Sequence, residues 1–283
     1  MTSAARNGRV DAGGVGLAYV EAGATGPPVV LVHGFTGAKE DFGDHIAWLG
    51  ERRRTVAFDN RGHGESDRTD TYSLDLVRRD LGAFVDALGL DRFVLVGHSM
   101  GGFVAQLFAL AAPERLVGLV LMGTGPRSPH LDEDTRQMAD LARRLAVQAG
   151  MDVLLQAQQS LAEDDTAATA LASEAGEALR RDRPGFAEFC DAKFLATDPV
   201  AYDELLGDIL TQEDRTESLC GLDVATLVIV GEQDSAFRKA SQRMAAAIPG
   251  ARLEEIPGAG HSPQFEAPEQ WRATMGAFLD ELT

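Results

Sequence analysis

Short, continuously apolar runs that alternate with helical patterns constrain the fold of this chain more than any other feature. The clearest runs are Val29–Val32, Thr55–Phe58, Phe93–Val96, Val117–Met122 and Leu227–Val230. Runs with no alternating polar position are typical of parallel strands that helices cover on both faces. A weaker run, Arg252–Ile256, is expected to form the last strand, and Val10–Val20 an antiparallel hairpin at a sheet edge. The sequence therefore predicts an α/β fold with a mostly parallel sheet.

The composition narrows the class of protein further. Of 283 residues, 45% are hydrophobic and 25% charged, which is typical of a globular chain with one large or two smaller domains. The formal net charge of −18 repels nucleic-acid phosphates and anionic lipid. Residues 1–10 contain no apolar signal segment, and no apolar run reaches the roughly 18 to 20 residues of a membrane span. We expect a cytoplasmic protein that binds neither nucleic acid nor membrane.

Residues 126–221 interrupt the alternation, because no run there is typical of a strand. Apolar residues recur instead at helical spacing, in four groups: Met138, Leu141 and Leu145; Leu171, Ala175 and Leu179; Phe186, Phe189 and Cys190; and Leu205, Leu206, Ile209 and Leu210. Asp132 is expected to cap the first of these helices and Gly150 to end it. We expect residues 126–221 to form a helical cap over the carboxyl ends of the strands, where α/β sheets bind ligands. Residues 1–125 and 222–283 then form the core.

The segment Gly97-His98-Ser99-Met100-Gly101-Gly102 follows one apolar run directly and leads into the apolar helical stretch Phe103–Ala111. A strand-to-helix turn this tight holds its serine in a strained backbone conformation. Side chains two residues to either side would not fit, so both positions need glycine. The context therefore predicts Ser99 as a nucleophile at the carboxyl end of a strand.

A serine hydroxyl needs a base that accepts its proton and an acid that orients the base. Asp234 follows the apolar run that ends at Val230, and His261 follows the last expected strand. Residues 123–130, the other position at which an acid could stand, contain no carboxylate. The chain order serine, aspartate, histidine is the order that a nucleophile turn of this type uses.

The segment His33-Gly34-Phe35 closes the first central strand. Acyl transfer passes through a tetrahedral intermediate whose oxyanion needs backbone N–H donors. One donor comes from the residue after the nucleophile, Met100, and the other from the loop after this strand, at Phe35.

Five segments together resemble the α/β-hydrolase superfamily: His33-Gly34-Phe35, Arg61-Gly62-His63-Gly64-Glu65-Ser66, Gly97-His98-Ser99-Met100-Gly101-Gly102, Gly231-Glu232-Gln233-Asp234 and Gly260-His261. The resemblance covers nearly the whole chain except residues 126–221. It implies an eight-stranded sheet with a helical lid inserted after the sixth strand, and Ser99, Asp234 and His261 as the catalytic triad. Ser99 separates the chain from the epoxide hydrolases and haloalkane dehalogenases, whose nucleophile is an aspartate.

The branch of this superfamily stays open at this point. His33-Gly34-Phe35-Thr36-Gly37 and Asp234-Ser235-Ala236-Phe237 also resemble the menaquinone-pathway enzymes that eliminate pyruvate. That family usually has tyrosine before the serine and arginine after the two glycines, where this chain has His98 and Phe103. The meta-cleavage C–C hydrolases and the 3-oxoadipate enol-lactonases are similar to a comparable degree.

Three functional hypotheses follow. The first is a cofactor-free serine hydrolase that cleaves carboxylic esters or lactones through an acyl-enzyme. The second uses the same triad to cleave a C–C bond or eliminate a carboxylate, and needs a pocket cation from Arg127, Arg143, Arg180 or Arg183. The third is a ligand receptor that has the fold without turnover.

The remaining expectations concern the pocket and its partners. His98, Phe186 and Phe189 are expected to line a pocket for a small ester or lactone. Two cysteines, Cys190 and Cys220, are too few for a disulfide framework or a four-ligand zinc site, and no phosphate-binding loop is present, so neither metal nor cofactor is expected. Residues 126–221 hold 20 acidic and 9 basic residues, which favours a neutral substrate over a polyanion. The sequence leaves monomer and homodimer open.

Overall fold

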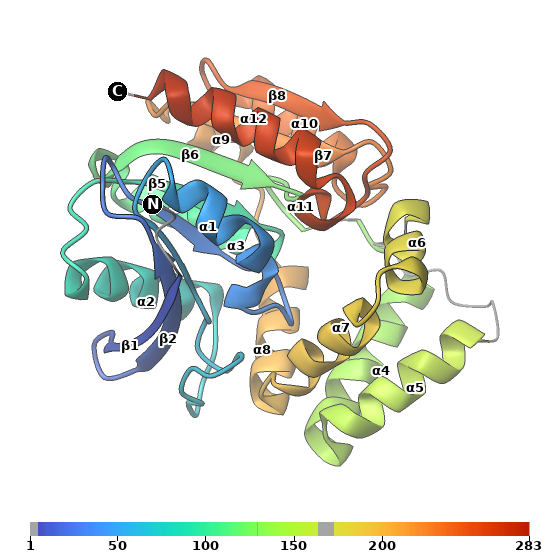
Figure 1. Cartoon of the computed structure of the whole chain (residues 1–283). Helices are drawn as coiled ribbons and strands as arrows, with labels where there is room; N and C mark the ends of the chain where they lie inside the picture. The colour runs from blue at the N-terminus through green and yellow to red at the C-terminus, as the bar shows by residue number, and fades with distance from the viewer. Residues whose placement is uncertain (1–4, 129, 164–172, 283) are drawn as a thin grey trace.

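An eight-stranded, mostly parallel sheet runs through the molecule, as the sequence predicts (Figure 1). The computed structural model describes residues 5–128, 130–163 and 173–282. The strands are β1 (Arg6–Asp11), β2 (Gly16–Ala22), β3 (Val29–Val32), β4 (Thr55–Phe58), β5 (Phe93–His98), β6 (Leu116–Met122), β7 (Thr226–Gly231) and β8 (Arg252–Ile256). Their order is β1-β2-β4-β3-β5-β6-β7-β8. The hairpin β1–β2 and the pair β2–β4 are antiparallel, and all other neighbours are parallel.

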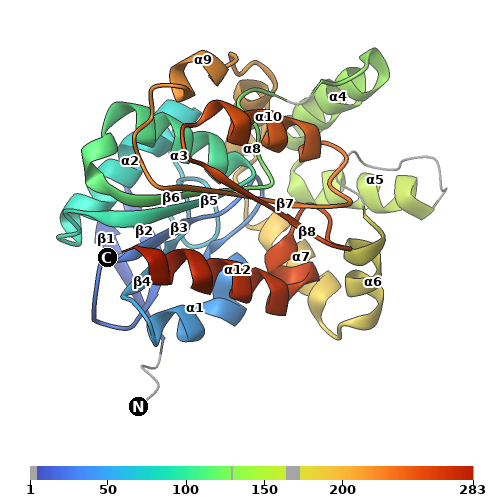
Figure 2. The ribbon, with the colours of Figure 1, turned by 90° about the horizontal axis from the view of Figure 1, so that it is seen from above.

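Helices cover both faces of the sheet, which explains why its central strands are apolar at every position. The core elements are η1 (Lys39–Phe42), α1 (Gly43–Gly50), α2 (Leu74–Ala87), α3 (Met100–Ala111), η2 (Pro113–Arg115), α10 (Arg238–Ala247), α11 (Pro263–Glu266) and α12 (Pro268–Glu281). Helices α1 and α12 lie on one face, and α2, α3 and α10 on the other (Figure 2). Val29 and Leu31 pack with the α1 and α12 side, whereas Val30 and Val32 pack with the other side.

The turn from β5 into α3 depends on two glycines. Ser99 adopts φ 53° and ψ −114°, a left-handed φ that side-chain-bearing residues rarely adopt. A Cβ at Gly101 would lie 2.7 Å from the carbonyl oxygen of His33 and closer still to that of Val32. A Cβ at Gly97 would lie 2.6 Å from the Gly101 carbonyl carbon. The glycines therefore let α3 start directly against β3 and β5, as expected from the sequence.

Between β6 and β7 the regular elements that the described residues form are all helices. They are α4 (Glu133–Ala149), α5 (Met151–Glu163), α6 (Glu174–Asp182), α7 (Phe186–Leu195), α8 (Pro199–Leu210) and α9 (Thr216–Leu219). Asp132 caps α4 by accepting a hydrogen bond from the Thr135 amide, and α4 ends at Gly150, both as expected. Helices α4–α7 stand beyond the carboxyl ends of the strands in Figures 1 and 2.

Two details of this helical segment differ from the sequence-based expectation. Helix α9 packs against α10 and α3, and its Leu219 is buried in the main core, as are Ala201, Leu205 and Ile209 of α8, so the last part of residues 126–221 packs on the helices that cover the sheet. On α4, Met138 and Leu141 are 47% and 51% exposed, because α5 and α8 cover only the end of the helix around Ala146. Leu171, which the sequence places on a helix face, lies outside the described residues.

We expect Gly101→Ala to lower the free energy of unfolding by about 3 kcal/mol or more, because the new methyl group meets backbone carbonyls that cannot move aside. Gly82→Ala on α2 is the matched control. Its Cβ would meet only a Phe108 ring atom at 3.9 Å, so it should stabilise the protein by about 0.5–1 kcal/mol. Urea unfolding of both variants measures the difference; equal effects of the two substitutions would contradict the packing argument.

Candidate active site

Three loops at the carboxyl ends of β5, β7 and β8 bring Ser99, Asp234 and His261 together. The Nε2 atom of His261 lies 2.9 Å from Ser99 Oγ, and its Nδ1 atom lies 2.9 Å from Asp234 Oδ2. Because an ionised carboxylate only accepts hydrogen bonds, His261 carries its proton on Nδ1 and presents the Nε2 lone pair to the serine hydroxyl. The three side chains form one continuous hydrogen-bonded chain across 162 residues of sequence.

Asp234 and His261 are held in place by their surroundings. Asp234 is buried, and its second oxygen accepts a hydrogen bond from the amide of Phe237 at 3.0 Å. The Phe237 ring stacks on the His261 imidazole with 5.3 Å between centroids and 25° between planes. This stacking fixes the plane of the imidazole, so the hydrogen bonds to Asp234 and Ser99 can form together.

His98, which the sequence predicts at the pocket edge, makes two kinds of contact in the site. It is among the residues that line the cavity beside Ser99, and its Nε2–H donates to the backbone carbonyl of His261 at 2.9 Å. Burial, with a smaller contribution from the neighbouring His261, lowers the pKa of His98 to about 4. A neutral His98 therefore ties the turn that carries Ser99 to the loop that carries His261.

The loop after β3 packs directly on the nucleophile turn. A Cβ at Gly34 would lie 3.2 Å from both the Ser99 Cβ and the His98 Nδ1, so the two loops touch. Within the described residues, the amides of Phe35 and Met100 donate no hydrogen bond to a protein acceptor. Thr36 has φ 55°, an uncommon value for a β-branched residue, and its hydroxyl donates to the Phe35 carbonyl.

A cavity of about 450 Å³ opens onto these loops and is bounded on the other side by the helical segment. Its lining residues are Gly34, Phe35, Thr36, Gly37, Asp41, His98, Ser99, Leu155, Gln158, Arg180, Cys190, Asp191, Lys193, Phe194, His261, Ser262 and Phe265. A second groove of about 520 Å³ lies between α3, η2 and α9 and contains none of the predicted site residues. Because open α/β sheets bind ligands at the carboxyl ends of their strands, the cavity beside Ser99 is the candidate site.

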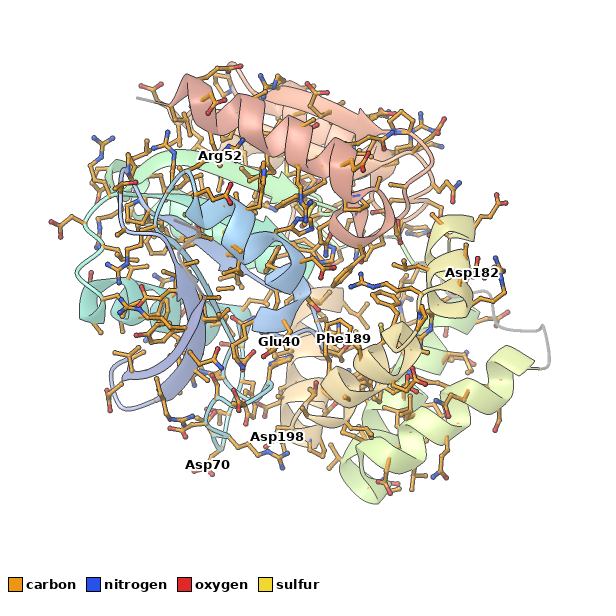
Figure 3. All side chains as sticks on the ribbon, in the orientation of Figure 1. Glu40, Arg52, Asp70, Asp182, Phe189 and Asp198 are labelled. Carbon is orange, nitrogen blue, oxygen red and sulfur yellow. The ribbon has the colours of Figure 1, made fainter. Side chains whose placement is uncertain are left out.

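The expectation that Phe186 and Phe189 line this cavity is not met. Both rings instead pack edge-on against Phe265, with centroid distances of 5.2 and 5.9 Å. The phenylalanines that do reach the lining are Phe194 of α7 and, from the core, Phe35 and Phe265. Figure 3 shows Phe189 where α7 meets the core, and Phe189 is not among the residues that line the cavity.

The charged lining is the feature that the sequence analysis missed. Lys193 on α7 and Asp41 on η1 form an ion pair inside the cavity, and Arg180 pairs with Asp191 at 3.2 Å. Of the four arginines considered from sequence, Arg180 alone is among the lining residues. The other three pair elsewhere, Arg127 with Asp214, Arg143 with Asp203 and Arg183 with Asp44. Lys193 lies four residues, or about one helical turn, after Phe189 on α7. That spacing is the only feature of the sequence that points to it.

The start of α6 docks on the loops that carry the acid and the base. Ser173 Oγ lies 3.3 Å from Glu266 Oε1, and the other oxygen of Glu266 accepts from the Gly260 amide, next to His261. A Cβ at Gly260 would collide with Ser173, so glycine is required there for docking. Burial raises the pKa of Glu266, and hydrogen bonds from Gly260 and Ser262 offset part of this rise.

With this geometry established, comparison with known proteins identifies the family. Residues 27–268 match the family described as alpha/beta hydrolase fold. The chain belongs to the α/β-hydrolase family.

The relatives of this α/β-hydrolase indicate an enzyme of the hydrolase type. It is 31% identical over 268 residues to a putative 2-succinyl-6-hydroxy-2,4-cyclohexadiene-1-carboxylate synthase of Bacillus subtilis, covering 90% of each chain. A thermophilic esterase from Thermogutta terrifontis is similar at 27% identity and a TM-score of 0.83, covering 98% of this chain and 99% of that one. The enol-lactonase of Burkholderia xenovorans shares the fold at 24% identity and a TM-score of 0.83, covering 97% of this chain and 100% of that one.

The described residues of this hydrolase contain neither a metal-binding cluster nor a membrane-spanning helix. Residues 5–128, 130–163 and 173–282 contain no group of three or more histidine, cysteine, aspartate and glutamate side chains placed to hold a metal ion. In the same residues, no helix combines the length and apolarity that crossing a membrane requires.

Buried histidines make the stability of the hydrolase depend on pH. Burial lowers the pKa of His98 to about 4 and that of His63 to about 3, from an ordinary value of 6.5. Below pH 6.5 the unfolded chain therefore binds protons that the folded chain does not, so the folded state loses stability as the pH falls towards the folded pKa.

We expect the free energy of unfolding to fall steeply from about pH 6.5 to about pH 5, with His98 alone contributing about 2 kcal/mol to the loss. His98→Gln should flatten the slope by about 1.4 kcal/mol per pH unit, because the proton uptake of one site disappears. His130→Gln is the control, since His130 is exposed. Urea unfolding across this range measures both slopes; an unchanged slope in His98→Gln would exclude this origin.

Proposed function

We propose that the protein is a serine hydrolase that cleaves carboxylic esters or lactones through an acyl-enzyme. The observation that carries the proposal is the hydrogen-bonded chain from Ser99 through His261 to Asp234, with Ser99 held at a strained, glycine-flanked turn. A nucleophile, a base and an orienting acid in this order and geometry are what acyl transfer by serine requires.

In the first half-reaction, Ser99 Oγ attacks the substrate carbonyl carbon while its proton passes to His261 Nε2. Asp234 stabilises the imidazolium that results, because its carboxylate accepts from Nδ1. His261 then donates the proton to the departing alkoxide oxygen, and Ser99 is left as an ester of the acyl group. In the second half-reaction His261 takes a proton from water, which attacks the acyl carbon, and returns that proton to Ser99 as the acid leaves.

The proposed oxyanion donors are the amides of Phe35 and Met100. They come from the two loops that touch at Gly34, and both amides are free of protein acceptors within the described residues. Met100 opens helix α3, so the positive end of the helix adds to the stabilisation of a negative oxygen. The hydrogen bond from Thr36 to the Phe35 carbonyl fixes the peptide on the other side of Phe35.

The proposed cap consists of α4–α8, which bound the cavity opposite the catalytic loops. Phe35 supports this assignment, because its ring packs against Tyr202 of α8 at 4.9 Å and against the small apolar cluster of the helical segment. The two cations in the cavity lining, Lys193 and Arg180, are each paired with a carboxylate. A lining with balanced charges favours a neutral ester or lactone over a polyanion.

A second candidate keeps the same triad and eliminates a carboxylate or cleaves a C–C bond. The similarity to the Bacillus subtilis synthase favours it, and Lys193 and Arg180 are the cations it would use. It differs from the first candidate in its substrates, since a ring-cleavage dienone or a succinylated cyclohexadiene should then be turned over far faster than any simple ester.

Ser99→Ala should lower hydrolysis of p-nitrophenyl butyrate by about ten-thousand-fold or more, because among the described residues only the Ser99 hydroxyl is hydrogen-bonded to His261 Nε2. It should also abolish labelling by a fluorophosphonate probe, measured by intact mass. Ser218→Ala, on the exposed surface of α9, is the control and should keep both properties. Wild-type protein that binds ligands but neither reacts with the probe nor hydrolyses esters would be a receptor and not an enzyme.

Asp234→Asn should lower kcat by about 10³ to 10⁴, because an amide at this position no longer fixes the proton of His261 on Nδ1. Asp223→Asn replaces an exposed aspartate before β7 and should leave kcat unaltered. Steady-state kinetics on p-nitrophenyl butyrate compares the two. A loss of less than tenfold in Asp234→Asn would remove Asp234 from the proposed triad.

A further inference from the structure

The ion pair of Lys193 and Asp41 lies inside the cavity that holds Ser99, and the proposed mechanism makes no use of it. Its side chains are largely withdrawn from water, with 15% of Lys193 and 5% of Asp41 exposed. The pair links the cap helix α7 to η1, which follows the proposed oxyanion loop. Both residues nevertheless line the cavity, so a bound substrate can reach them.

The ammonium group is held in place by aromatic rings. Lys193 Nζ lies 4.7 Å from the centroid of Phe189 and 5.6 Å from that of Phe265, within the range of cation–π attraction. Phe189 does not line the cavity itself, but it contacts the ammonium group of a residue that does. Of its three N–H donors, Lys193 uses only one in a hydrogen bond within the described residues, to Asp41 Oδ1.

The carboxylate has an unused acceptor. Asp41 Oδ1 accepts from Lys193, and within the described residues no donor is bonded to Oδ2. Oδ2 lies beside Gly37, another residue of the lining, because a Cβ on that glycine would collide with it. Oδ2 is not among the fully buried polar atoms that lack a partner in the described residues, so it remains open to a donor from a bound molecule. The pair therefore offers the cavity an N–H donor next to a carboxylate acceptor.

The chemistry of the pair selects among ligand groups. A substrate carboxylate would be attracted by Lys193 but repelled by Asp41, and a substrate cation would meet the opposite combination. A hydroxyl group satisfies both partners at once, because its oxygen accepts from the ammonium while its hydrogen is donated to the carboxylate.

We propose that Lys193 and Asp41 form a hydroxyl-binding subsite, and that the substrate is a hydroxylated ester or lactone. The assignment rests on the proposed ester hydrolysis and deepens it. Lys193 and Asp41 are specificity-determining residues that bind the substrate hydroxyl away from the scissile carbonyl. A site built to bond a hydroxyl rejects the analogue that lacks it, because the buried pair then loses its partner.

The test compares esters that differ only at one oxygen. Ethyl butanoate is the parent, and the hydroxylated set consists of ethyl 2-hydroxybutanoate, ethyl 3-hydroxybutanoate and 2-hydroxyethyl butanoate, each with its methoxy analogue. Acid release in a pH-stat gives kcat/KM for each ester. We expect at least one hydroxylated ester to exceed the parent about tenfold or more, and its methoxy analogue to fall below it, since a methoxy oxygen accepts from Lys193 but donates nothing to Asp41.

Variants connect this preference to the pair. The double variant Lys193→Met/Asp41→Leu replaces the ions with apolar side chains, so neither charge is left buried alone, and it should reduce the hydroxyl preference to about one. Lys193→Met alone should lower the preference as well. Lys239→Met removes an exposed lysine from α10 and should retain the wild-type preference. Thermal unfolding confirms that each variant is folded.

The outcomes separate this assignment from the proposed function. Hydrolysis of the parent ester with no preference for any hydroxylated ester overturns the subsite alone. A preference that survives in the double variant also overturns it, because another group must then bind the hydroxyl. If the wild-type protein hydrolyses none of the esters, the proposed ester hydrolysis fails, and the subsite fails with it.

Discussion

The close approach of the β5–α3 turn to strand β3 is the constraint on which the rest of the site depends. Gly101 lies against the carbonyls of Val32 and His33, and Gly34 lies against Ser99 from the other side. Only backbone without side chains can pack this tightly, and the packing keeps Ser99 at its left-handed φ. The nucleophile and the proposed oxyanion donors are thus positioned by one contact between two loops. His98 extends the same contact to the loop of His261.

Helices α7 and α8 and the start of α6 contact the loops that carry the candidate site residues. Phe35 packs against Tyr202, Lys193 pairs with Asp41, and Ser173 reaches Glu266 beside the His261 loop. These contacts connect α8 and α7 to the β3–α1 connection, and the start of α6 to the loop that carries His261. A movement of the helical segment would therefore alter the surroundings of Ser99, His261 and the cavity lining together.

The fold alone leaves the substrate open, because the relatives of this chain carry names of different reactions on the same architecture. The cavity lining distinguishes between substrate classes where the fold does not. Its cations are each paired with an acid, and within the part of the chain that the structure describes its most buried pair keeps a donor and an acceptor without a partner. Such a lining suits a neutral, hydroxyl-bearing molecule. The acidic excess of residues 126–221 also favours a neutral substrate over a polyanion.

The sequence by itself determined the strands, the nucleophile turn and the order of Ser99, Asp234 and His261. Each of these is encoded locally, in a continuous apolar run or in a turn whose glycines have no alternative. Only the tertiary structure decided that α9 packs with the core, that Phe189 supports Lys193 and that Lys193 meets Asp41. Helical spacing shows that residues share a face but not what that face contacts. The partners of the ion pair are 152 residues apart and are joined only when the cap docks on the sheet.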